Sequence, residues 1–549
     1  MRVDGRRRLM PCGPIALVLG LALACAAGGP VPAERSEAGL STSAAPPPEA
    51  AAPAVKAGDL VFAADFEDAQ ALRAWSGSPR TDAGREGGRA VVVTCADAAS
   101  AAAVTVPLPA AHLRGCKIIF SAYVKAEKVS DRPQPWNGVK FMAPIDSPSG
   151  RLWPQGAIPV GTFGWRRVVW QAFVPEDATV MTLVLGLERV TGTVWFDDVR
   201  VVVRRPPIVR RPRPAAAGPV YTGRDLPRLR GAMVSCDPTR EDLRVLGRLW
   251  NANLIRWQLT GWQPPAERTA LEAYDGFLES HLKRLDAALP WCEEYGLRVV
   301  VDLHAAPTGP PGSGRGLFND AACQEKFVEV WRKMARRYKD SKAVWAYDLL
   351  NEPVEDAVDE AVDDWQALAA RAARAVREID PGHAILVEPA QGGGPDGLRE
   401  LVPLDVPGVV YRVHMYLPGA VTHQGVFDEG ARKWAYPGRI DGVDWDKARL
   451  EQALRPVRDF QDAYGVHIYI GEFSAIRWAP DGSAFRYLRD LIDLFEARGW
   501  DWSYHAFREW SGWSVEHGPD KADAEPARTP TDRETLLRDW FARNRKPAG

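Results

Sequence analysis

The sequence predicts a multidomain chain in which an all-β jelly-roll sandwich precedes a (β/α)8 TIM barrel. Three observations predict this organisation. The chain has 549 residues, more than one hydrophobic core usually holds. Residues 58–204 contain short apolar runs separated by turn residues, without helical periodicity, which is typical of a β-sandwich. Residues 220–549 repeat an apolar run followed by a helical pattern, which is typical of a (β/α)8 barrel.

The first residues have the pattern of an export signal. Arg6-Arg7-Arg8 precedes the apolar stretch 15–24, as the basic and apolar regions of a secretory signal do. We assign residues 1–25 to this signal and expect an exported protein. The end of the segment resembles a bacterial lipoprotein signal, so secretion and a lipid anchor on Cys25 both stay open. We expect no other link to a membrane.

Two segments of biased composition lie outside the predicted domains. Residues 26–57 are almost all Ala, Pro, Gly, Ser and Glu. Such a segment has too few large apolar groups to offset the entropy lost on folding, so we expect a disordered tether. Residues 205–219 mix prolines with arginines and alanines, as a semi-rigid linker does.

The sandwich is predicted from five apolar runs, at 60–62, 90–93, 118–120, 167–170 and 182–185. Asp65-Phe66-Glu67 and the segment 194–199 resemble the two ends of jelly-roll carbohydrate-binding modules, which implies sugar binding. Indole rings stack on the apolar faces of sugars but also fill cores. We therefore expect most of the tryptophans here to be core and one or two to bind sugar; they are Trp136, Trp153, Trp165 and Trp170.

Charge and cysteine content limit the partners and cofactors. With 69 basic and 71 acidic residues the net charge is −2, so we exclude nucleic acid, whose binders concentrate basic charge. We expect a monomer. Five cysteines follow the signal, an odd number, and a bridge between Cys95 and Cys116 is open. The one cofactor considered is a structural calcium with oxygen ligands from Asp65, Glu67, Asp197 and Asp198.

The eight barrel strands are predicted at 229–235, 252–258, 297–304, 344–351, 384–388, 409–416, 467–472 and 500–507. The segments between them show helical spacing, for example at Phe327, Trp331, Met334 and Tyr338, which fall on one helix face. The weakest helical pattern lies around 398–404. In such a barrel the C-terminal ends of all strands meet at one mouth, where the chemistry takes place.

Polar residues gather at these predicted strand ends. They are Arg256, His304, Asn351, Glu352, His414, Tyr416 and Glu472, with Trp502, His505 and Trp510 on or just after the last strand. Two carboxylates facing each other across a sugar are what retaining glycoside hydrolysis needs. Glu388 ends the fifth strand and is a rival carboxylate, although a structural pairing is the simpler interpretation. Histidine and glutamate can bind zinc, but no H-x-x-x-H or comparable spacing is present, so we expect no metal.

Five motifs at strand ends resemble glycoside hydrolase family 5, the cellulase-like family of clan A. The resemblance covers residues 221–545, and its motifs are Asn253-Leu254-Ile255-Arg256, Asp302-Leu303-His304, Asn351-Glu352-Pro353, Val413-His414-Met415-Tyr416 and Ile470-Gly471-Glu472-Phe473. It implies that Glu352 is the acid/base and Glu472 the nucleophile. It further implies that Asn351 binds the substrate's 2-hydroxyl. Arg256 and Tyr416 would orient Glu472, and His304 and His414 would line the subsite.

The eighth strand departs from the family pattern, which usually offers a tryptophan there as a stacking floor. In this chain the strand reads Trp502-Ser503-Tyr504-His505-Ala506-Phe507, and Arg508-Glu509-Trp510 follows. We assign the floor to Trp510, with Trp513 behind it.

The resemblance implies a retaining β-glycoside hydrolase that needs no cofactor and cuts a β-linked polysaccharide, most simply as an endo-β-1,4-glucanase. β-Mannan, xyloglucan, β-1,3-glucan and a glycolipid are alternative substrates. A non-catalytic carbohydrate-binding lipoprotein is the alternative from another class. A serine hydrolase is disfavoured because no G-x-S-x-G elbow follows a strand.

Overall fold

The computed structural model of the chain describes residues 55–547 except 69, 149, 209–225, 266–269, 311–315, 356–357, 428–429 and 431. The predicted export signal with Cys25, most of the predicted tether and most of the predicted linker lie outside these residues. The chain divides into two compact units, one containing the sandwich and one containing the barrel. None of the helices in the described part is long and apolar enough to cross a membrane.

The first unit is built from two antiparallel sheets, as predicted. One sheet has the order β2-β3-β11-β5-β9, with β1 beside β11. Its strands are β1 (Leu60–Ala64), β2 (Arg80–Ala83), β3 (Arg89–Cys95), β5 (Lys117–Val129), β9 (Gly161–Phe173) and β11 (Gly192–Arg205). The second sheet has the order β4-β10-β7-β8, with β6 beside β10. Its strands are β4 (Ala101–Leu108), β6 (Gly138–Met142), β7 (Ile145–Ser147), β8 (Gly150–Leu152) and β10 (Val180–Glu188). Short helical turns lie at Ala71–Ala74, Arg85–Gly87 and Ala110–Leu113.

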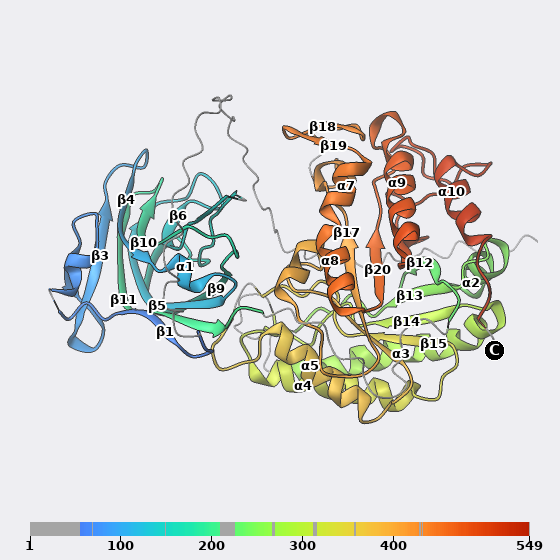
Figure 1. Cartoon of the computed structure of the whole chain (residues 1–549), viewed down its shortest axis with the longest axis horizontal. Helices are drawn as coiled ribbons and strands as arrows, with labels where there is room; N and C mark the ends of the chain where they lie inside the picture. Colours follow the sequence, from blue (N-terminus) through green and yellow to red (C-terminus); the bar gives the residue numbers. More distant parts are fainter. Residues whose placement is uncertain are drawn as a thin grey trace, which may run out of the picture. The chain divides into compact units, whose positions relative to one another are not determined.

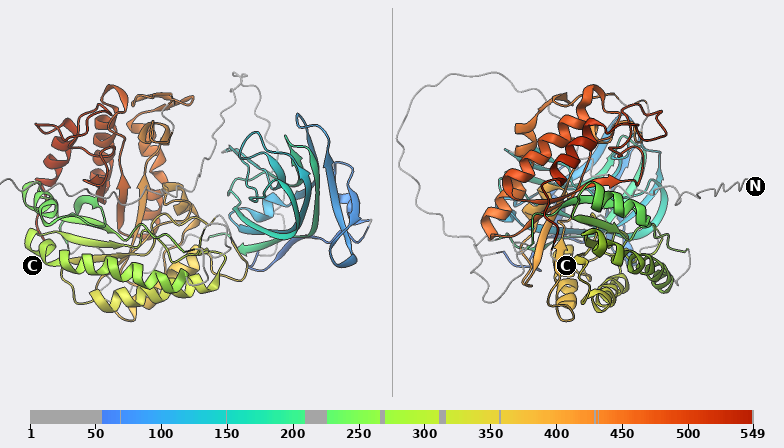
Figure 2. Two further views of the ribbon diagram at one scale, coloured as in Figure 1. Left: turned by 180° about the vertical axis from the view of Figure 1, so that it is seen from behind. Right: turned by 90° about the vertical axis from the view of Figure 1, so that its right-hand side faces the viewer.

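Alternation of side chains explains how the sandwich closes. In β10 every second residue is buried, namely Met181, Leu183, Leu185 and Leu187, because successive side chains of a strand point to opposite faces. The buried residues of both sheets form one apolar core, and Figure 2 shows the two sheets from behind as blue-to-green strands. Within this core the ring of Trp170 stacks on that of Phe120, with 3.9 Å between centroids.

The bridge considered between Cys95 and Cys116 does not form. All five cysteines in the described residues are free and buried. Cys95 pairs with Gly192 at the start of β11, whereas Lys117, the neighbour of Cys116, pairs with Arg205 at its end. The two thiols therefore lie near opposite ends of one long strand, too far apart for a bridge.

The four acidic residues considered as calcium ligands do not form a cluster. Main-chain N–H groups donate to three of the four carboxylates: Glu67 to Asp65, Arg89 to Glu67 and Arg85 to Asp197. The fourth, Asp198, forms an ion pair with Arg85 at 2.9 Å. Among the described residues, no three of these acidic groups come close enough to share an ion.

The second unit is a closed barrel of eight parallel strands, which confirms the predicted fold class. In order around the barrel they are β12 (Arg230–Val234), β13 (Leu254–Gln258), β14 (Arg298–Asp302), β15 (Val344–Asp348), β16 (Ala384–Val387), β17 (Val409–Met415), β20 (Ile468–Phe473) and β21 (Asp501–Phe507). Each strand overlaps its predicted segment. A small hairpin, β18 (Gly438–Ile440) and β19 (Val443–Trp445), is added between β17 and β20.

Helices surround the strands (Figure 1). The α-helices are α2 (Arg240–Arg244), α3 (Ala270–Tyr295), α4 (Ala321–Tyr338), α5 (Trp365–Arg377), α6 (Gly419–Thr422), α7 (Lys447–Ala453), α8 (Arg455–Tyr464), α9 (Ser483–Arg498) and α10 (Asp532–Phe541). A π-helical turn, η3 (Val245–Leu249), continues α2. Helix α4 begins where the side chain of Asp320 accepts from the N–H of Ala322, and it buries the predicted apolar face.

The weakest predicted helix, around 398–404, is a 3-10 turn, η4 (Pro395–Glu400). This turn begins with a proline and contains Gly397, and three glycines, 392, 393 and 394, precede it. Glycine destabilises a regular helix. A second 3-10 turn, η5 (Pro480–Gly482), precedes α9.

Candidate active site

Charged side chains fill the barrel interior near the strand ends. Each one follows an apolar residue two positions earlier on the same strand, and residues two apart in a strand share a face. The pairs are Leu254 and Arg256, Val300 and Asp302, Ala346 and Asp348, Leu386 and Glu388, and Val410 and Arg412, all buried. The apolar members belong to one buried cluster. An apolar layer therefore supports an ionic layer at the C-terminal side of the barrel.

Arg256 is the centre of this ionic layer. Its Nη1 lies 2.5 Å from Oε1 of Glu472, its Nε lies 2.9 Å from Oδ2 of Asp348, and its Nη2 lies 2.9 Å from Oδ1 of Asp302. The same Nη2 donates to Oδ1 of Asn351 at 2.9 Å. One fully buried guanidinium thus balances the negative charge of three carboxylates and also orients the amide of Asn351. The planar guanidinium can do this because it carries five N–H donors in a fixed arrangement.

Glu472 is held as an ionised carboxylate. Its second oxygen, Oε2, accepts a hydrogen bond from the hydroxyl of Tyr416 at 2.9 Å. Burial alone would raise the pKa of Glu472, but the positive charges of His414, His505 and Arg256 hold it well below its usual range. With both oxygens fixed and its charge retained, this side chain is prepared for nucleophilic attack.

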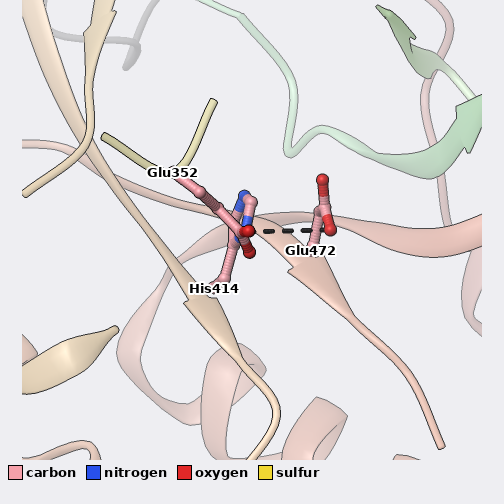
Figure 3. Close-up of side chains that lie close together, drawn as sticks. All are labelled: Glu352, His414 and Glu472. Carbon is pink, nitrogen blue, oxygen red and sulfur yellow. Dashed lines mark hydrogen bonds and ion pairs between the residues drawn. The ribbon is translucent and has the colours of Figure 1, made fainter. Parts of the chain in front are cut away.

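Glu352 lies opposite Glu472. It follows β15 in a left-handed backbone conformation, with φ 43°, and its side chain is 29% exposed, whereas that of Glu472 is 7% exposed. Nδ1 of His414 lies 2.9 Å from Oε1 of Glu352 and 3.7 Å from Oε2 of Glu472. The three side chains point toward one another (Figure 3).

The carboxyl groups of Glu352 and Glu472 approach each other closely. Oxygen atoms of Glu352 and Glu472 and a ring nitrogen of His414 all lie within 4.8 Å of one another. Such a set could also hold a metal ion, and among the described residues it is the only group of three that could. The two carboxylates already have protein partners: His414 contacts Glu352, and Tyr416 and Arg256 contact Glu472. Their close approach therefore needs no metal ion to explain it.

The remaining predicted residues are placed around this pair. Nδ1 of His304 lies 2.8 Å from Oδ2 of Asp302. Burial would lower the pKa of His304, but Asp302 raises it above its ordinary value. Trp510 contacts the rings of Trp478 and Trp513, at 5.8 and 5.7 Å between centroids. The ring of Trp513 in turn lies 6.2 Å from that of Tyr416.

His505, near the end of β21, was expected at the mouth but was given no role, and Glu509 was not predicted there. The ring of His505 lies 6.2 Å from that of Tyr416. Its Nε2 lies 3.6 Å from Oε2 of Glu509. Burial would lower the pKa of His505, but Glu472 and Glu509 raise it. A polar pair, His505 and Glu509, therefore lies close to Tyr416, and the position of His505 on the strand was the only signal for it.

Asp348 and Arg412 were also missed, although the sequence contains a signal for both. Asp348 lies between Ala346 and Leu350 on one face of its strand, and Arg412 follows Val410 on one face of the next but one. Arg412 Nε lies 2.7 Å from Oδ1 of Asp348. A buried charge in a strand needs a partner, so these two positions could have been predicted to pair.

Replacing Arg256 with methionine is expected to destabilise the barrel by about 3–5 kcal/mol, because removing one member of a buried ionic group leaves the others uncompensated. Urea unfolding of the purified chain measures this loss. Arg244→Met is the matched control, since Arg244 and Glu241 form an exposed pair and such pairs contribute about 0–1 kcal/mol. Similar small losses in both variants would contradict the importance of the ionic layer.

Comparison with known proteins adds sequence evidence to this geometry. A family model described as cellulase (glycosyl hydrolase family 5) matches residues 225–511. Endoglucanase C of Acetivibrio thermocellus is 30% identical over 246 residues, which are 40% of this chain and 71% of that protein. Cellodextrinase A of Ruminococcus flavefaciens is 25% identical over 296 residues, covering 52% of this chain and 85% of that protein. A structure of Thermotoga maritima Cel5A with mannotriose is 25% identical, with a TM-score of 0.44, and the match covers 56% of this chain and 97% of that chain.

Proposed function

Because the chain belongs to glycosyl hydrolase family 5, the cellulase family, we propose that it is a retaining endo-β-1,4-glucanase with Glu472 as nucleophile and Glu352 as acid/base. The chain is a glycoside hydrolase that acts on polysaccharide. The observation that supports the two roles is the close approach of the two carboxylates, whose oxygens lie within 4.8 Å. Retaining enzymes place their carboxyl groups about 5–5.5 Å apart, and inverting enzymes about 6.5–9.5 Å apart.

The different surroundings of the two glutamates support different roles. In the first step the ionised Glu472 attacks the anomeric carbon while Glu352 gives its proton to the departing glycosidic oxygen. In the second step Glu352 takes a proton from water, the water attacks the same carbon, and the ester bond to Glu472 breaks. Glu352 must meet both a leaving group and water, and its side chain is the more exposed of the two.

Binding roles follow from the contacts of the neighbouring residues. Arg256 donates to the side-chain oxygen of Asn351, and this bond orients the amide so that its NH2 group can donate to the 2-hydroxyl of the sugar. His304 and His414 line the same subsite in this proposal. Trp510, which is half-buried, serves as the stacking floor in this proposal.

A polysaccharide panel tests the substrate. The names of two relatives, an endoglucanase and a cellodextrinase, favour β-1,4-glucan over β-mannan, xyloglucan, β-1,3-glucan or a glycolipid. We expect soluble β-glucan to lose viscosity early, before much reducing sugar appears, because internal cleavage shortens chains at once. Release of monomer or dimer alone would contradict endo action. A chain that hydrolyses none of these substrates would favour the alternative of a binding protein.

The sandwich supports a second role, the binding of the same polysaccharide. Trp136 and Trp153 are 53% and 55% exposed, whereas Trp170 is buried in the core. Nζ of Lys140 donates to the main-chain oxygen of Trp136 at 2.5 Å and forms an ion pair with Glu188 at 2.7 Å, which fixes the segment that presents Trp136. We propose that these two exposed indoles stack on sugar rings.

Replacing both Trp136 and Trp153 with alanine is expected to weaken binding to insoluble cellulose by roughly tenfold, since an aromatic contact contributes about 0.5–1.5 kcal/mol. Hydrolysis of a soluble substrate should not change. Depletion binding and soluble-substrate assays measure the two effects. Leu60→Ala removes a side chain that is equally exposed, 55%, and is the control. Unchanged cellulose binding in the double variant would refute the role of the sandwich.

Export is the remaining proposal about this chain. The basic and apolar segments at residues 6–8 and 15–24 support it, and we propose a monomer that is secreted or lipid-anchored through Cys25. The mass of the mature N-terminal peptide distinguishes the two forms, because a lipid on Cys25 adds the mass of its acyl chains. An uncleaved N-terminus would contradict export by this route.

A further inference from the structure

A third carboxylate, Glu388, lies directly behind the acid/base. It follows the last residue of β16, and its side chain is completely buried. Its Oε2 accepts the main-chain N–H of Glu352 at 2.6 Å. Its Oε1 lies 3.1 Å from Nε2 of His414, the histidine whose other ring nitrogen contacts Glu352. Glu388 therefore contacts the backbone of Glu352 directly and reaches its carboxyl group through His414.

The backbone of Glu352 needs such a contact. Its φ of 43° lies in the left-handed region, which non-glycine residues adopt only when the surroundings impose it. The hydrogen bond from the Glu352 N–H to Glu388 is one such constraint. Because the direction of a side chain depends on its backbone, this bond also determines where the Glu352 carboxyl group points.

The ring of His414 is constrained in the same way. Nε2 lies 3.1 Å from Oε1 of Glu388 and also contacts Nη1 of Arg412, while Nδ1 lies 2.9 Å from Oε1 of Glu352. The imidazole therefore lies between the two carboxylates, and Arg412, the ion-pair partner of Glu388, contacts the same ring nitrogen. The main-chain N–H of His414 donates to the oxygen of Gly393 at 2.9 Å. A Cβ at Gly393 would lie 1.8 Å from Oε1 of Glu388, so a glycine at this position leaves room for the carboxylate.

Stability alone does not explain an acidic group at this position. Burial raises the pKa of Glu388 to about 7. The negative charges of Glu352 and Asp348 also raise this pKa, whereas Arg412 and His414 lower it. Arg412 Nη2 compensates it at 2.6 Å from Oε2. Buried ion pairs are often no more stabilising than apolar residues of similar volume, and Leu386 occupies the same face two residues earlier. The acidic group therefore points to a function.

We propose that Glu388 is a positioning residue for the proton-transfer half of the reaction. It holds Glu352 through its amide and His414 through its ring, so that the Glu352 proton is aimed at the glycosidic oxygen. Glu388 itself contacts neither the sugar nor the reacting atoms, and no bond to it forms or breaks. The inference rests on the roles proposed above for Glu352 and Glu472.

The dependence on leaving group tests this inference. A 2,4-dinitrophenyl β-cellobioside leaves without a proton, whereas phenyl β-cellobioside and cellotetraose need one. Glu388→Gln is expected to lower kcat/KM for the latter two by roughly tenfold to a hundredfold, a part of what general acid catalysis contributes. The dinitrophenyl substrate should stay within about threefold of the original chain, because attack by Glu472 does not use the acid.

The control variant is Asp380→Asn. Asp380 is a buried acid that precedes the same strand, and it lies 2.7 Å both from the hydroxyl of Tyr347 and from Nδ1 of His383. Loss of this acid should lower stability without making activity depend on the leaving group. Glu388→Ala should show the same pattern as Glu388→Gln with a larger loss, and the glutamine variant suffices if the alanine variant does not fold.

Equal losses on all three substrates, or no loss on any, would overturn the positioning role. Failure of the proposed function is a separate outcome. If the original chain hydrolyses no β-glucoside and Glu472 cannot be labelled by an activated fluorosugar, the roles of Glu352 and Glu472 fail as well. If labelling succeeds and Glu388→Gln has no effect, only the inference about Glu388 fails.

Discussion

Replacing Glu472 with alanine is expected to lower kcat by roughly 10⁴-fold or more on every substrate, the size of loss seen when a covalent nucleophile is removed. Among the described residues, Glu472 is the one carboxylate that contacts both Arg256 and Tyr416, so no equivalent group is in place to attack the anomeric carbon. Activated aryl glycosides should lose as much as polysaccharide, because the first step needs the nucleophile whatever the leaving group is. Initial rates on both substrate types measure this loss.

Added azide distinguishes the loss of the nucleophile from a loss of structure. A small anion that enters the space left by the Glu472 carboxylate attacks from the same side, so an activated substrate should yield an α-glycosyl azide. Near-normal turnover of any substrate by Glu472→Ala would show that this carboxylate is not the nucleophile.

Replacing Glu352 with alanine is expected to give a loss that depends on the substrate. Hydrolysis of polysaccharide should fall by roughly 10²–10⁴-fold, which is the usual contribution of a general acid/base. Formation of the covalent intermediate from a dinitrophenyl glycoside should be spared, because that leaving group departs without a proton. Pre-steady-state release of the phenol measures this step separately from overall turnover.

Azide should rescue the Glu352→Ala variant and give a β-glycosyl azide. The anion needs no general base, and it attacks the intermediate on the face that water normally uses. The product therefore has the opposite anomeric configuration to the one expected from Glu472→Ala. Equal loss on all substrates, with no rescue by azide, would contradict the acid/base role.

The barrel could be predicted because its strands and helices have different periods. Strands buried on both faces appear as nearly continuous apolar runs, such as 344–350, where Asp348 is the one charged residue. The helices between them place apolar residues on one side, as Phe327 and Trp331 do. Once the strand ends are known, the barrel topology brings them to one mouth. This is why Arg256, Glu352, His414, Tyr416 and Glu472 could be expected in one site before their contacts were known.

Other features depend on pairings that a single sequence does not reveal. The register of β11 against β3 and β5 places Cys95 and Cys116 near opposite ends of a strand, and no local pattern of residues indicates that register. Loop conformation places Trp510 beside Trp478 and Trp513, and loops lack the periodicity on which sequence interpretation depends.

The position of Glu388 could be predicted, but its contacts could not. It was expected at the end of the fifth strand as a rival carboxylate or as a structural partner. Its hydrogen bond to the N–H of Glu352 occurs together with the positive φ of that residue, and the sequence Asn351-Glu352-Pro353 specifies neither. The buried side chain of Glu388 and its ion pair with Arg412 make it a supporting group in the structure.

Covalent trapping tests the central claim most directly. The intact chain is incubated with 2,4-dinitrophenyl 2-deoxy-2-fluoro-β-cellobioside, digested, and analysed by mass spectrometry. The fluorine slows both steps, but the activated leaving group lets the first proceed, so the glycosyl-enzyme should accumulate. We predict one added fluorocellobiosyl group per chain, attached to the peptide that contains Glu472. A label on Glu352 or Glu388, or an unlabelled chain that releases an α-configured first product from β-glucan, would contradict the assignment.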